Sequence, residues 1–248
     1  MQRYFLADHY FQNGKVTFSE ETTKHISRVM RMKAGARLIV CNEHGACFTA
    51  ELTEEEPLSA KIIEEEKDIK ELPVQVTIAQ GLPKGDKLEY VIQKGTELGA
   101  ASFLPFTAAR SIVKFDDKKA AKKIERWQKI AQEASEQAHR SRVPLVKTPV
   151  NFSSLCKEAE KFDHIIAAYE ESAKIGEKTL FNQTLQSMSA GDKILVIIGP
   201  EGGLSEKEAA SLEEHQAMLC SFGPRILRTE TAPLYALAAL SYYFELSR

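Results

Sequence analysis

Two glycine-rich turns, each directly after a short apolar segment, constrain this chain more than any other feature. The first follows the β-branched run of residues 194–198 and reads Gly199-Pro-Glu-Gly-Gly203. A short run of that composition predicts a buried strand. Ser205 and Glu208 have the spacing of a capping box, so we expect a helix to begin there. The order strand, glycine turn, helix predicts a place where backbone N–H groups face a ligand.

The second turn repeats this arrangement. A short strand is expected over residues 218–221, followed by Phe222-Gly-Pro224, and a helix is expected from about Thr231 with Pro233 in its first turn. An ordinary loop is the alternative interpretation of one such turn. Two of them at successive strand ends favour a ligand site, because open α/β sheets bind ligands at the carboxyl ends of their strands.

These stretches resemble the signature of the RsmE family. The matching residues are Ile-Ile-Gly-Pro-Glu-Gly-Gly-Leu-Ser over 197–205 and Gly-Pro-Arg-Ile-Leu-Arg-Thr-Glu-Thr-Ala over 223–232, with further blocks upstream, so the resemblance covers nearly all of 74–248. RsmE proteins are SPOUT-class methyltransferases that methylate N3 of a uridine in 16S ribosomal RNA. The resemblance implies a trefoil-knotted α/β domain that binds S-adenosyl-L-methionine in the knot and forms a homodimer.

The chain changes character near residue 73. Residues 1–72 read mostly as strands, with a turn at 42–45 and a short helix over 22–32, whereas strands alternate with helices from residue 74. Strands are expected over 3–6, 15–18, 37–41, 46–52, 74–79, 102–106 and 164–169, and helices over about 87–99 and 117–139. We therefore expect an α/β fold: a SPOUT-type knotted parallel-sheet domain over 73–248, preceded over 1–72 by what the resemblance implies is a PUA-like RNA-binding β-barrel, with a linker over 67–73.

The cofactor needs a mostly apolar slot with backbone hydrogen-bond partners. The resemblance and this geometry together assign to the slot Gly199, Glu201, Gly202, Ser221, Phe222, Gly223, Ile226 and Leu227. For the apolar residues Phe222, Ile226 and Leu227, plain core packing is the alternative interpretation.

Methylation at N3 of uracil requires loss of the N3 proton, which spreads negative charge over the two neighbouring carbonyl oxygens. A fixed cation would stabilise that charge, and we assign this role to Arg228. A carboxylate would accept the proton, and Glu230 is the candidate. Stabilisation of the following helix through its dipole is the alternative role for Glu230. His139 is a more remote candidate base.

The formal net charge of −2 does not by itself indicate a nucleic-acid partner, but the charge is unevenly distributed. Residues 1–40 carry seven Lys and Arg against three Asp and Glu, and residues 110–147 carry eleven against five. Basic faces are therefore compatible with an acidic chain. The candidate contacts to 16S ribosomal RNA in the small ribosomal subunit are Arg28, Arg31, Lys84, Arg110, Arg140 and Arg142, although each is also compatible with an ordinary surface charge.

A metal site is suggested by the spacing of Cys41, His44 and Cys47, but the sequence nearby has no fourth ligand. We expect no metal, and reduced, buried thiols. The longest uncharged apolar run, 232–240, is too short to cross a membrane, and the first twenty residues hold no apolar run of signal-peptide length. A cytoplasmic protein without membrane contact is the expectation.

Two other classes of function remain open. One is a non-catalytic RNA-binding protein with the same fold, which the intact glycine turns speak against. The other is a phosphate-binding enzyme that uses the first turn as an anion cradle. Glu201 within that turn would repel a phosphate, and no Gly-Lys-Ser/Thr follows, so this class ranks last.

Overall fold

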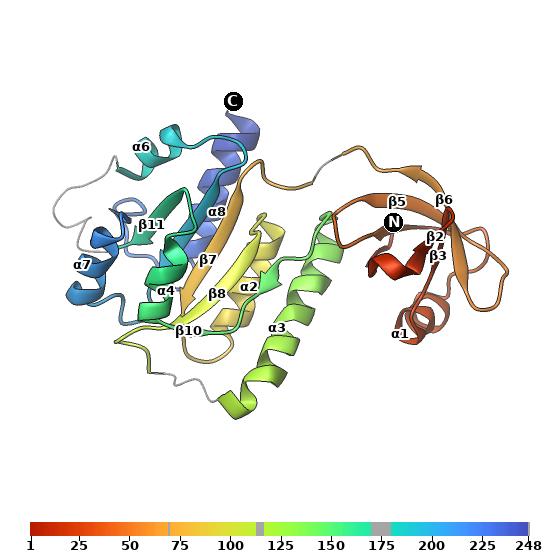
Figure 1. Ribbon diagram of the computed structural model, residues 1–248, viewed down its shortest axis with the longest axis horizontal. Helices are drawn as coiled ribbons and strands as arrows, with labels where there is room; N and C mark the ends of the chain where they lie inside the picture. The colour runs from red at the N-terminus through yellow and green to blue at the C-terminus, as the bar shows by residue number, and fades with distance from the viewer. Residues whose placement is uncertain (69, 113–116, 170–179, 248) are drawn as a thin grey trace. The chain divides into compact units, whose positions relative to one another are not determined.

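The computed structural model describes residues 1–68, 70–112, 117–169 and 180–247. The chain divides into two compact units, which are coloured by position along the chain in Figure 1. The first unit comprises Met1–Glu71 and Ser135–Val143, and the second comprises Leu72–Ala134 and Pro144–Arg248. Ile69, within the predicted linker, lies outside the described residues.

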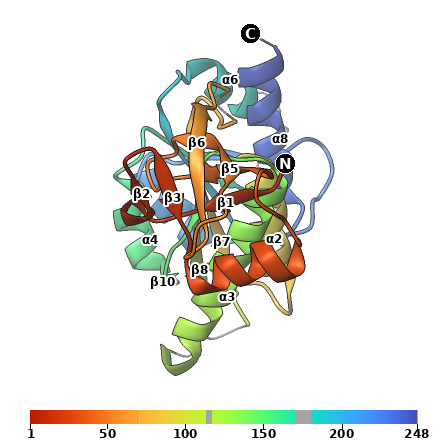
Figure 2. The ribbon, with the colours of Figure 1, turned by 90° about the vertical axis from the view of Figure 1, so that its right-hand side faces the viewer.

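The first unit is built on a six-stranded, mostly antiparallel sheet (Figure 2). Its strand order is β1 (Arg3–Phe5), β4 (Arg37–Cys41), β5 (Cys47–Leu52), β6 (Ser59–Glu65), β3 (Lys15–Thr17) and β2 (Phe11–Gln12), with only β1 and β4 parallel among the pairs described. The sheet curls around a core that includes the fully buried Val16, Ile26 and Leu38. Helix α1 (Glu20–Lys24) is capped by Ser19, whose Oγ accepts a hydrogen bond from the N–H of Thr22, and continues as a π-helical turn over His25–Val29.

The strands predicted for this unit and its 42–45 turn are confirmed, but strand β6 was not predicted. Its first residues, Ser59 and Ala60, are buried, whereas its far end consists of exposed glutamates. The acidic run over residues 64–68 is typical of an exposed edge, whereas β6 pairs with β5 on one side and with β3 on the other.

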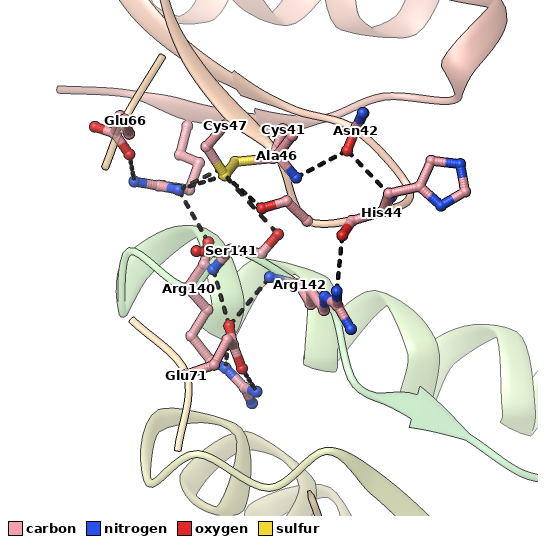
Figure 3. The surroundings of a disulfide bond; sticks show 12 residues. Cys41, Asn42, His44, Ala46, Cys47, Glu66, Glu71, Arg140, Ser141 and Arg142 are labelled. Atoms are coloured by element: carbon pink, nitrogen blue, oxygen red, sulfur yellow. Dashed lines mark hydrogen bonds and ion pairs between the residues drawn. A yellow bond between two sulfur atoms is a disulfide. The ribbon is translucent and has the colours of Figure 1, made fainter. Parts of the chain in front are cut away.

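The expectation of reduced thiols is wrong for Cys41 and Cys47, which form a disulfide (Figure 3). The two cysteines are register partners that close the β4–β5 hairpin, with Cα atoms 4.0 Å apart. The turn was predicted, but not that the cysteines face each other across it. Cys156 and Cys220 are free and buried, as expected. Among the described residues there is no group of three or more His, Cys, Asp or Glu that could hold a metal ion.

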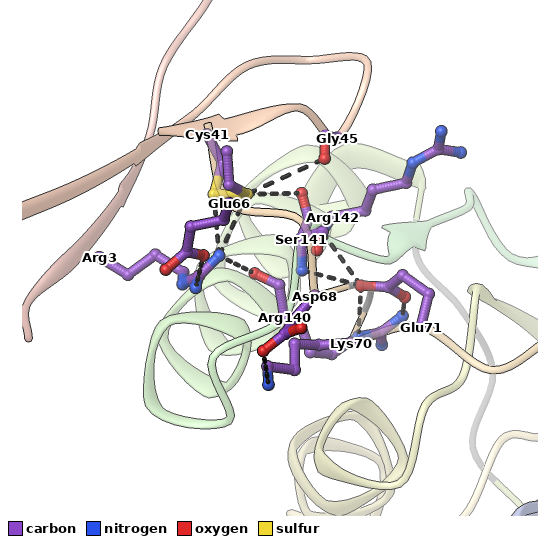
Figure 4. A network of polar contacts seen from close by, with 11 residues as sticks. Arg3, Cys41, Gly45, Glu66, Asp68, Lys70, Glu71, Arg140, Ser141 and Arg142 are labelled. Atoms are coloured by element: carbon purple, nitrogen blue, oxygen red, sulfur yellow. Dashed lines mark hydrogen bonds and ion pairs between the residues drawn. A yellow bond between two sulfur atoms is a disulfide. The ribbon is translucent and has the colours of Figure 1, made fainter. Parts of the chain in front are cut away.

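Arg3 is almost completely buried beside this disulfide, with 1% of its side chain exposed. Its Nη1 donates to the two sulfur atoms at 3.0 and 3.1 Å and to the carbonyl oxygen of Arg140 at 3.1 Å. Its Nη2 forms an ion pair with Glu66 at 2.7 Å (Figure 4). A buried guanidinium is costly unless it is paired, and these partners provide that compensation.

Glu71 binds the segment Ser135–Val143 into the first unit. Its carboxylate pairs with the guanidinium of Arg140, which is 4% exposed, and accepts hydrogen bonds from the N–H groups of Ser141 at 2.9 Å and Arg142 at 3.2 Å. Arg142 also donates to the carbonyl oxygen of His44 at 2.8 Å. The domain boundary expected at residue 72 placed this segment in the second domain, whereas the structure groups it with the first unit. Polar contacts between segments so far apart in sequence leave no local pattern, so the sequence did not indicate this grouping.

The second unit contains a seven-stranded sheet in which all described pairs are parallel. The order is β10 (Val150–Asn151), β8 (Ser102–Thr107), β7 (Gln75–Gly81), β12 (Lys193–Ile198), β11 (His164–Ala168) and β13 (Met218–Cys220), with β9 (Leu145–Val146) also paired to β8. The central strand β12 is buried from Ile194 to Ile198, which explains its continuous apolar run.

Helices cover both faces of this sheet (Figure 1). Helices α4 (Phe152–Ala159) and α7 (Glu206–Glu214) pack together over the face that holds Leu195 and Ile197. Side chains alternate along a strand, so the other face holds Ile194, Val196 and Ile198. On that side α8 (Ala232–Ser241), which continues as a π-helical turn over Tyr242–Leu246, contacts both β12 and α2 (Lys87–Glu97).

The larger elements predicted for the second unit are confirmed, including the capping box of α7 and the proline in the first turn of α8. Helix α3 runs over Asp117–Gln137 as expected. The short strands β9 and β10 and the helices α4 and α6 (Leu180–Ser187) were not predicted. No helix in the described part of the chain combines the length and apolar character needed to cross a membrane.

Replacing Glu71 by glutamine should destabilise the first unit by about 2 kcal/mol, because Arg140 would lose its charged partner while remaining buried. Glu64→Gln is the matched control, since Glu64 is an exposed glutamate of the same unit. Hydrogen exchange at the amides of Ser141 and Arg142 should accelerate in the Glu71 variant only. Equal exchange in the two variants would show that Glu71 does not hold this segment.

Candidate functional site

A cavity of about 740 Å³ lies where neighbouring parallel strands of the second unit end. Residues directly after β11, β12 and β13 line it, together with Lys87 from the start of α2. The carboxyl ends of parallel strands share one edge of the sheet, so their loops converge there. The volume is in the ordinary range for small-molecule sites.

Every residue predicted to bind the cofactor or act in catalysis lines this cavity. They are Gly199, Glu201, Gly202, Ser221, Phe222, Gly223, Ile226, Leu227, Arg228 and Glu230. The fold thus brings the two glycine turns together, although the individual roles of these residues stay predictions.

The first turn folds back tightly on itself, and Gly199 is the residue that permits this. A Cβ atom on Gly199 would lie 2.8 Å from the carbonyl carbon of Gly203 and 2.9 Å from the backbone nitrogen of Leu204. A Cβ on Gly81, at the end of β7, would lie 2.6 Å from Pro200. Since these neighbours are backbone or ring atoms, they cannot swing aside, so the turn requires glycine at both positions.

The loop after β8 braces the same turn. The Nη1 of Arg110 donates to the carbonyl oxygens of Gly202 at 2.9 Å and Leu204 at 3.2 Å. Glu208 accepts from the N–H of Ala109 at 2.7 Å while also closing the capping box with Ser205. Arg110, predicted as an RNA contact, therefore holds the carbonyl groups of the first glycine turn, Gly199–Gly203 and Leu204, which is called the cofactor turn below for its predicted role, and it lines the cavity.

Gln80 connects the two turns to the sheet, and sequence reasoning missed it. The side chain is fully buried, and its Nε2 donates to Oγ1 of Thr229 at 2.8 Å. The Thr229 hydroxyl in turn donates to the carbonyl oxygen of Gly199 at 2.6 Å. Thr229 stands between Arg228 and Glu230, so these bonds fix the backbone that carries both predicted catalytic residues. The signal was present in the sequence: a glutamine directly after the apolar residues of a central strand.

Lys87 is a second residue that sequence reasoning did not assign to the site. Its Nζ lies 2.9 Å from Oε1 of Glu201 and 3.4 Å from Oε2 of Glu230. The N–H of Lys84 also donates to Glu201, at 3.1 Å. The side chain of Glu201 therefore turns toward the start of α2 while it borders the cavity.

The ion pair between Lys87 and Glu201 shifts the pKa of both groups. The hydrogen bond to Glu201 raises the pKa of Lys87, burial opposes this, and Glu230 adds to the rise. Burial of Glu201 raises its pKa, but hydrogen bonds from Lys87 and backbone N–H groups hold the pKa below its ordinary value. Glu201 stabilises the fold as a carboxylate, and this contribution is lost as pH falls through its lowered pKa. Lys87 stabilises the fold as an ammonium group, and this contribution is lost as pH rises through its raised pKa. The pair is therefore intact around neutral pH.

For the apolar residues Phe222, Ile226 and Leu227, plain core packing was the alternative to a place in the cofactor slot, and their exposure decides part of this question. Ile226 is 76% exposed, so it is not a core residue of this chain. Phe222 is 7% exposed and packs between Phe181 and Tyr235, with ring centroids 4.9 and 5.9 Å away. It is thus a packed residue that also forms part of the cavity wall.

Arg228 is exposed at the cavity, and within the described ranges its guanidinium has no hydrogen-bond or ion-pair partner. Glu230 is more enclosed, with 17% of its side chain exposed. His139 belongs to the first unit and is not among the residues that line this cavity.

The remaining candidate RNA contacts divide between the two units. Arg28 and Arg31 are exposed in the first unit, beside the exposed apolar residues Val29 and Met30. Lys84 is exposed in the second. The assignment of Arg140 is corrected: its buried guanidinium pairs with Glu71, so it is not available to a phosphate group. Arg142, which was expected in the catalytic domain, is exposed in the first unit.

Comparison with known proteins agrees with this geometry. Residues 70–241 match the RNA methyltransferase domain family, and residues 18–65 match the RNA methyltransferase PUA domain family. The ribosomal RNA small subunit methyltransferase E of Bacillus subtilis is 50% identical over 253 aligned residues, which cover 100% of this chain and 99% of that protein. The chain belongs to the RsmE family. Its α/β fold combines a parallel-sheet methyltransferase domain with a curled PUA-like sheet.

Two solved RsmE-like structures share this fold and contain a bound cofactor. A putative methyltransferase from Legionella pneumophila, in complex with the cofactor SAM, has a TM-score of 0.82 at 32% identity and covers 96% of both chains. The ribosomal RNA small subunit methyltransferase E of Neisseria gonorrhoeae, bound to S-adenosylmethionine, has a TM-score of 0.81 at 28% identity and covers 98% of both.

Proposed function

We propose that this RsmE-family protein transfers a methyl group from S-adenosylmethionine to N3 of a specific uridine in 16S ribosomal RNA, acting on the small ribosomal subunit. The observation that carries the proposal is that both glycine turns line one cavity, together with Arg228, whose guanidinium has no hydrogen-bond or ion-pair partner among the described residues. The full-length similarity to a small-subunit RNA methyltransferase supports the substrate class.

The residues of the cavity fit S-adenosylmethionine. Its wall combines the apolar side chains of Ile198, Phe222 and Leu227 with the backbone of the two turns, which suits an adenosine group. Gly202 exposes backbone without side-chain bulk. The cofactor supplies a methyl group already activated by its sulfonium centre, so the proposed transfer requires no metal ion. The protein's task is to orient the two reactants.

Arg228 and Glu230 are the proposed catalytic residues. A guanidinium without an internal partner can approach a uracil carbonyl oxygen and stabilise the anion that develops during transfer. Glu230 would accept the N3 proton. Glu230 also lies in the turn directly before α8, where a carboxylate stabilises the helix through its dipole. This structural role is therefore the alternative to the role of proton acceptor.

The proposed RNA contacts are the exposed residues Arg28, Arg31, Lys84 and Arg142. The first two lie within the matched PUA domain. We further propose that the segments around the two turns form the trefoil knot expected of the SPOUT class, and that the protein acts in the cytoplasm. The adjacency of both turns at one sheet edge supports the knot.

We also propose a homodimer that forms through the second unit. Large apolar side chains are exposed on α8 and its extension: Tyr235 is 39% exposed, Tyr242 63% and Leu246 74%. A second copy of the chain would cover them. Sedimentation velocity at micromolar concentration should give twice the mass of 27.7 kDa, and a monomeric mass would contradict this proposal.

The central experiment incubates the protein with small ribosomal subunits that lack the modification, together with labelled S-adenosylmethionine. Label should enter 16S ribosomal RNA at the N3 position of one uridine, mapped by mass spectrometry. Label in another RNA, on another base atom or at no site would contradict the proposal.

Arg228→Ala should lower the single-turnover transfer rate by about a hundredfold, as for other charge-stabilising donors. S-adenosylmethionine affinity and melting temperature should change little, and Arg228→Lys should recover part of the rate. If the alanine variant instead loses cofactor affinity in proportion to its rate, Arg228 shapes the cofactor site and does not act in catalysis.

A further inference from the structure

We propose that Lys87 is a positioning residue of the transfer site, which holds Glu230 at the cavity and leaves Arg228 free to meet the substrate. The inference rests on the proposed function, because it concerns the two residues to which the chemistry is assigned. It adds a residue from a different element, the start of α2, which neither glycine turn contains.

Glu230 depends on Lys87 for its electrostatic partner. Its Oε2 atom is buried, and among the described residues no hydrogen-bond donor reaches it. The ammonium of Lys87, at 3.4 Å, is the cation of its ion pair. A carboxylate oxygen in that position is costly without a nearby positive charge. Without Lys87, the Glu230 carboxylate would lose the cation that holds it in its present place.

Lys87 serves the cofactor turn at the same time. The same Nζ atom bonds Glu201 at 2.9 Å, so one ammonium group joins the turn after β12 to the turn before α8. Glu201 keeps a second anchor, the N–H of Lys84 at 3.1 Å. Removal of Lys87 should therefore disturb Glu230 more than it disturbs the cofactor turn.

The arrangement also bears on Arg228, whose guanidinium has no ion-pair partner among the described residues. Six other charged residues line the cavity: Lys87, Arg110, Glu201, Glu206, Arg225 and Glu230. Lys87 engages both Glu201 and Glu230, and Arg110 binds the carbonyl oxygens of the turn after β12. Opposite charges within a few ångströms attract strongly in a partly enclosed site. By engaging Glu201 and Glu230, Lys87 removes two carboxylates that would compete with the substrate for Arg228.

The test compares Lys87→Met, Glu230→Gln and the double variant in single-turnover methyl transfer to small subunits, with S-adenosylmethionine affinity measured by calorimetry. Lys87→Met should slow transfer by about tenfold or more while affinity changes by less than about threefold, since the cofactor turn keeps its other anchors. The double variant should be no slower than Glu230→Gln alone. Lys87→Arg should recover part of the rate.

Lys94→Met is the matched control, because Lys94 lies on the same helix and pairs with Glu97. It should behave as the wild type. The proposal is overturned if Lys87→Met matches this control, if the rate losses of the two single variants multiply in the double variant, or if weaker cofactor binding accounts for the slower transfer.

A wild-type protein that transfers no methyl group to the small subunit would instead refute the proposed function. In that case the melting temperatures of the same variants test whether Lys87 stabilises Glu230 through their ion pair. Each single variant leaves a charge without its partner, whereas the double variant removes both charges. The two single decreases should therefore sum to more than the decrease in the double variant, and simple additivity would refute the link.

Discussion

The candidate site depends on a short chain of buried hydrogen bonds that runs from Gln80 through Thr229 to Gly199. Each of these residues belongs to a different segment: the end of β7, the turn before α8 and the turn after β12. Their polar groups lie in an interior that is otherwise apolar, where an unmade hydrogen bond is costly. The bonds therefore favour one relative placement of the two turns, the placement in which both line the cavity.

The charged side chains around the cavity belong to, or bind, the turns that these hydrogen bonds hold in place. Lys87 neutralises the carboxylates of Glu201 and Glu230, and Arg110 binds backbone carbonyl groups, whereas Arg228 has no ion-pair partner in the part of the chain that the structure describes. A site of this kind separates two tasks. Lys87 and Arg110 maintain the structure of the turns, and in the proposed function Arg228 stabilises the charge that develops on the substrate.

Local patterns in the sequence predicted the parts of the structure that depend on local physics. The apolar run before Gly199, the capping box at Ser205 and the proline of the last helix each predicted an element that the structure contains. The convergence of the two turns followed from a general property of parallel sheets. The family resemblance supplied the rest of the expected function.

The parts that could not be predicted depend on contacts between distant segments. The pairing of Glu71 with Arg140 joins residues that are far apart in sequence, and the disulfide depends on the register of one hairpin. Lys87 is a single polar residue whose importance appears only when its partners are known, whereas Gln80 could have been noticed as a glutamine that follows the apolar residues of a central strand. Arg110 and Arg140 were predicted as RNA contacts from the uneven distribution of charge, which does not show which basic side chains the protein itself engages. Arg140 is buried against Glu71, whereas Arg110 is exposed and also binds backbone carbonyl groups, so its RNA contact stays a prediction.

The most direct test of this account is the affinity for S-adenosylmethionine of Gln80→Leu and Thr229→Val, measured by calorimetry on folded protein. Each should weaken binding by about tenfold, whereas Thr229→Ser keeps the hydroxyl group and should bind normally. Thr77→Val is the control, because it removes a buried hydroxyl of the same strand that bonds Ser102 instead. Normal affinity in both Gln80→Leu and Thr229→Val would contradict the claim that these hydrogen bonds place the two turns.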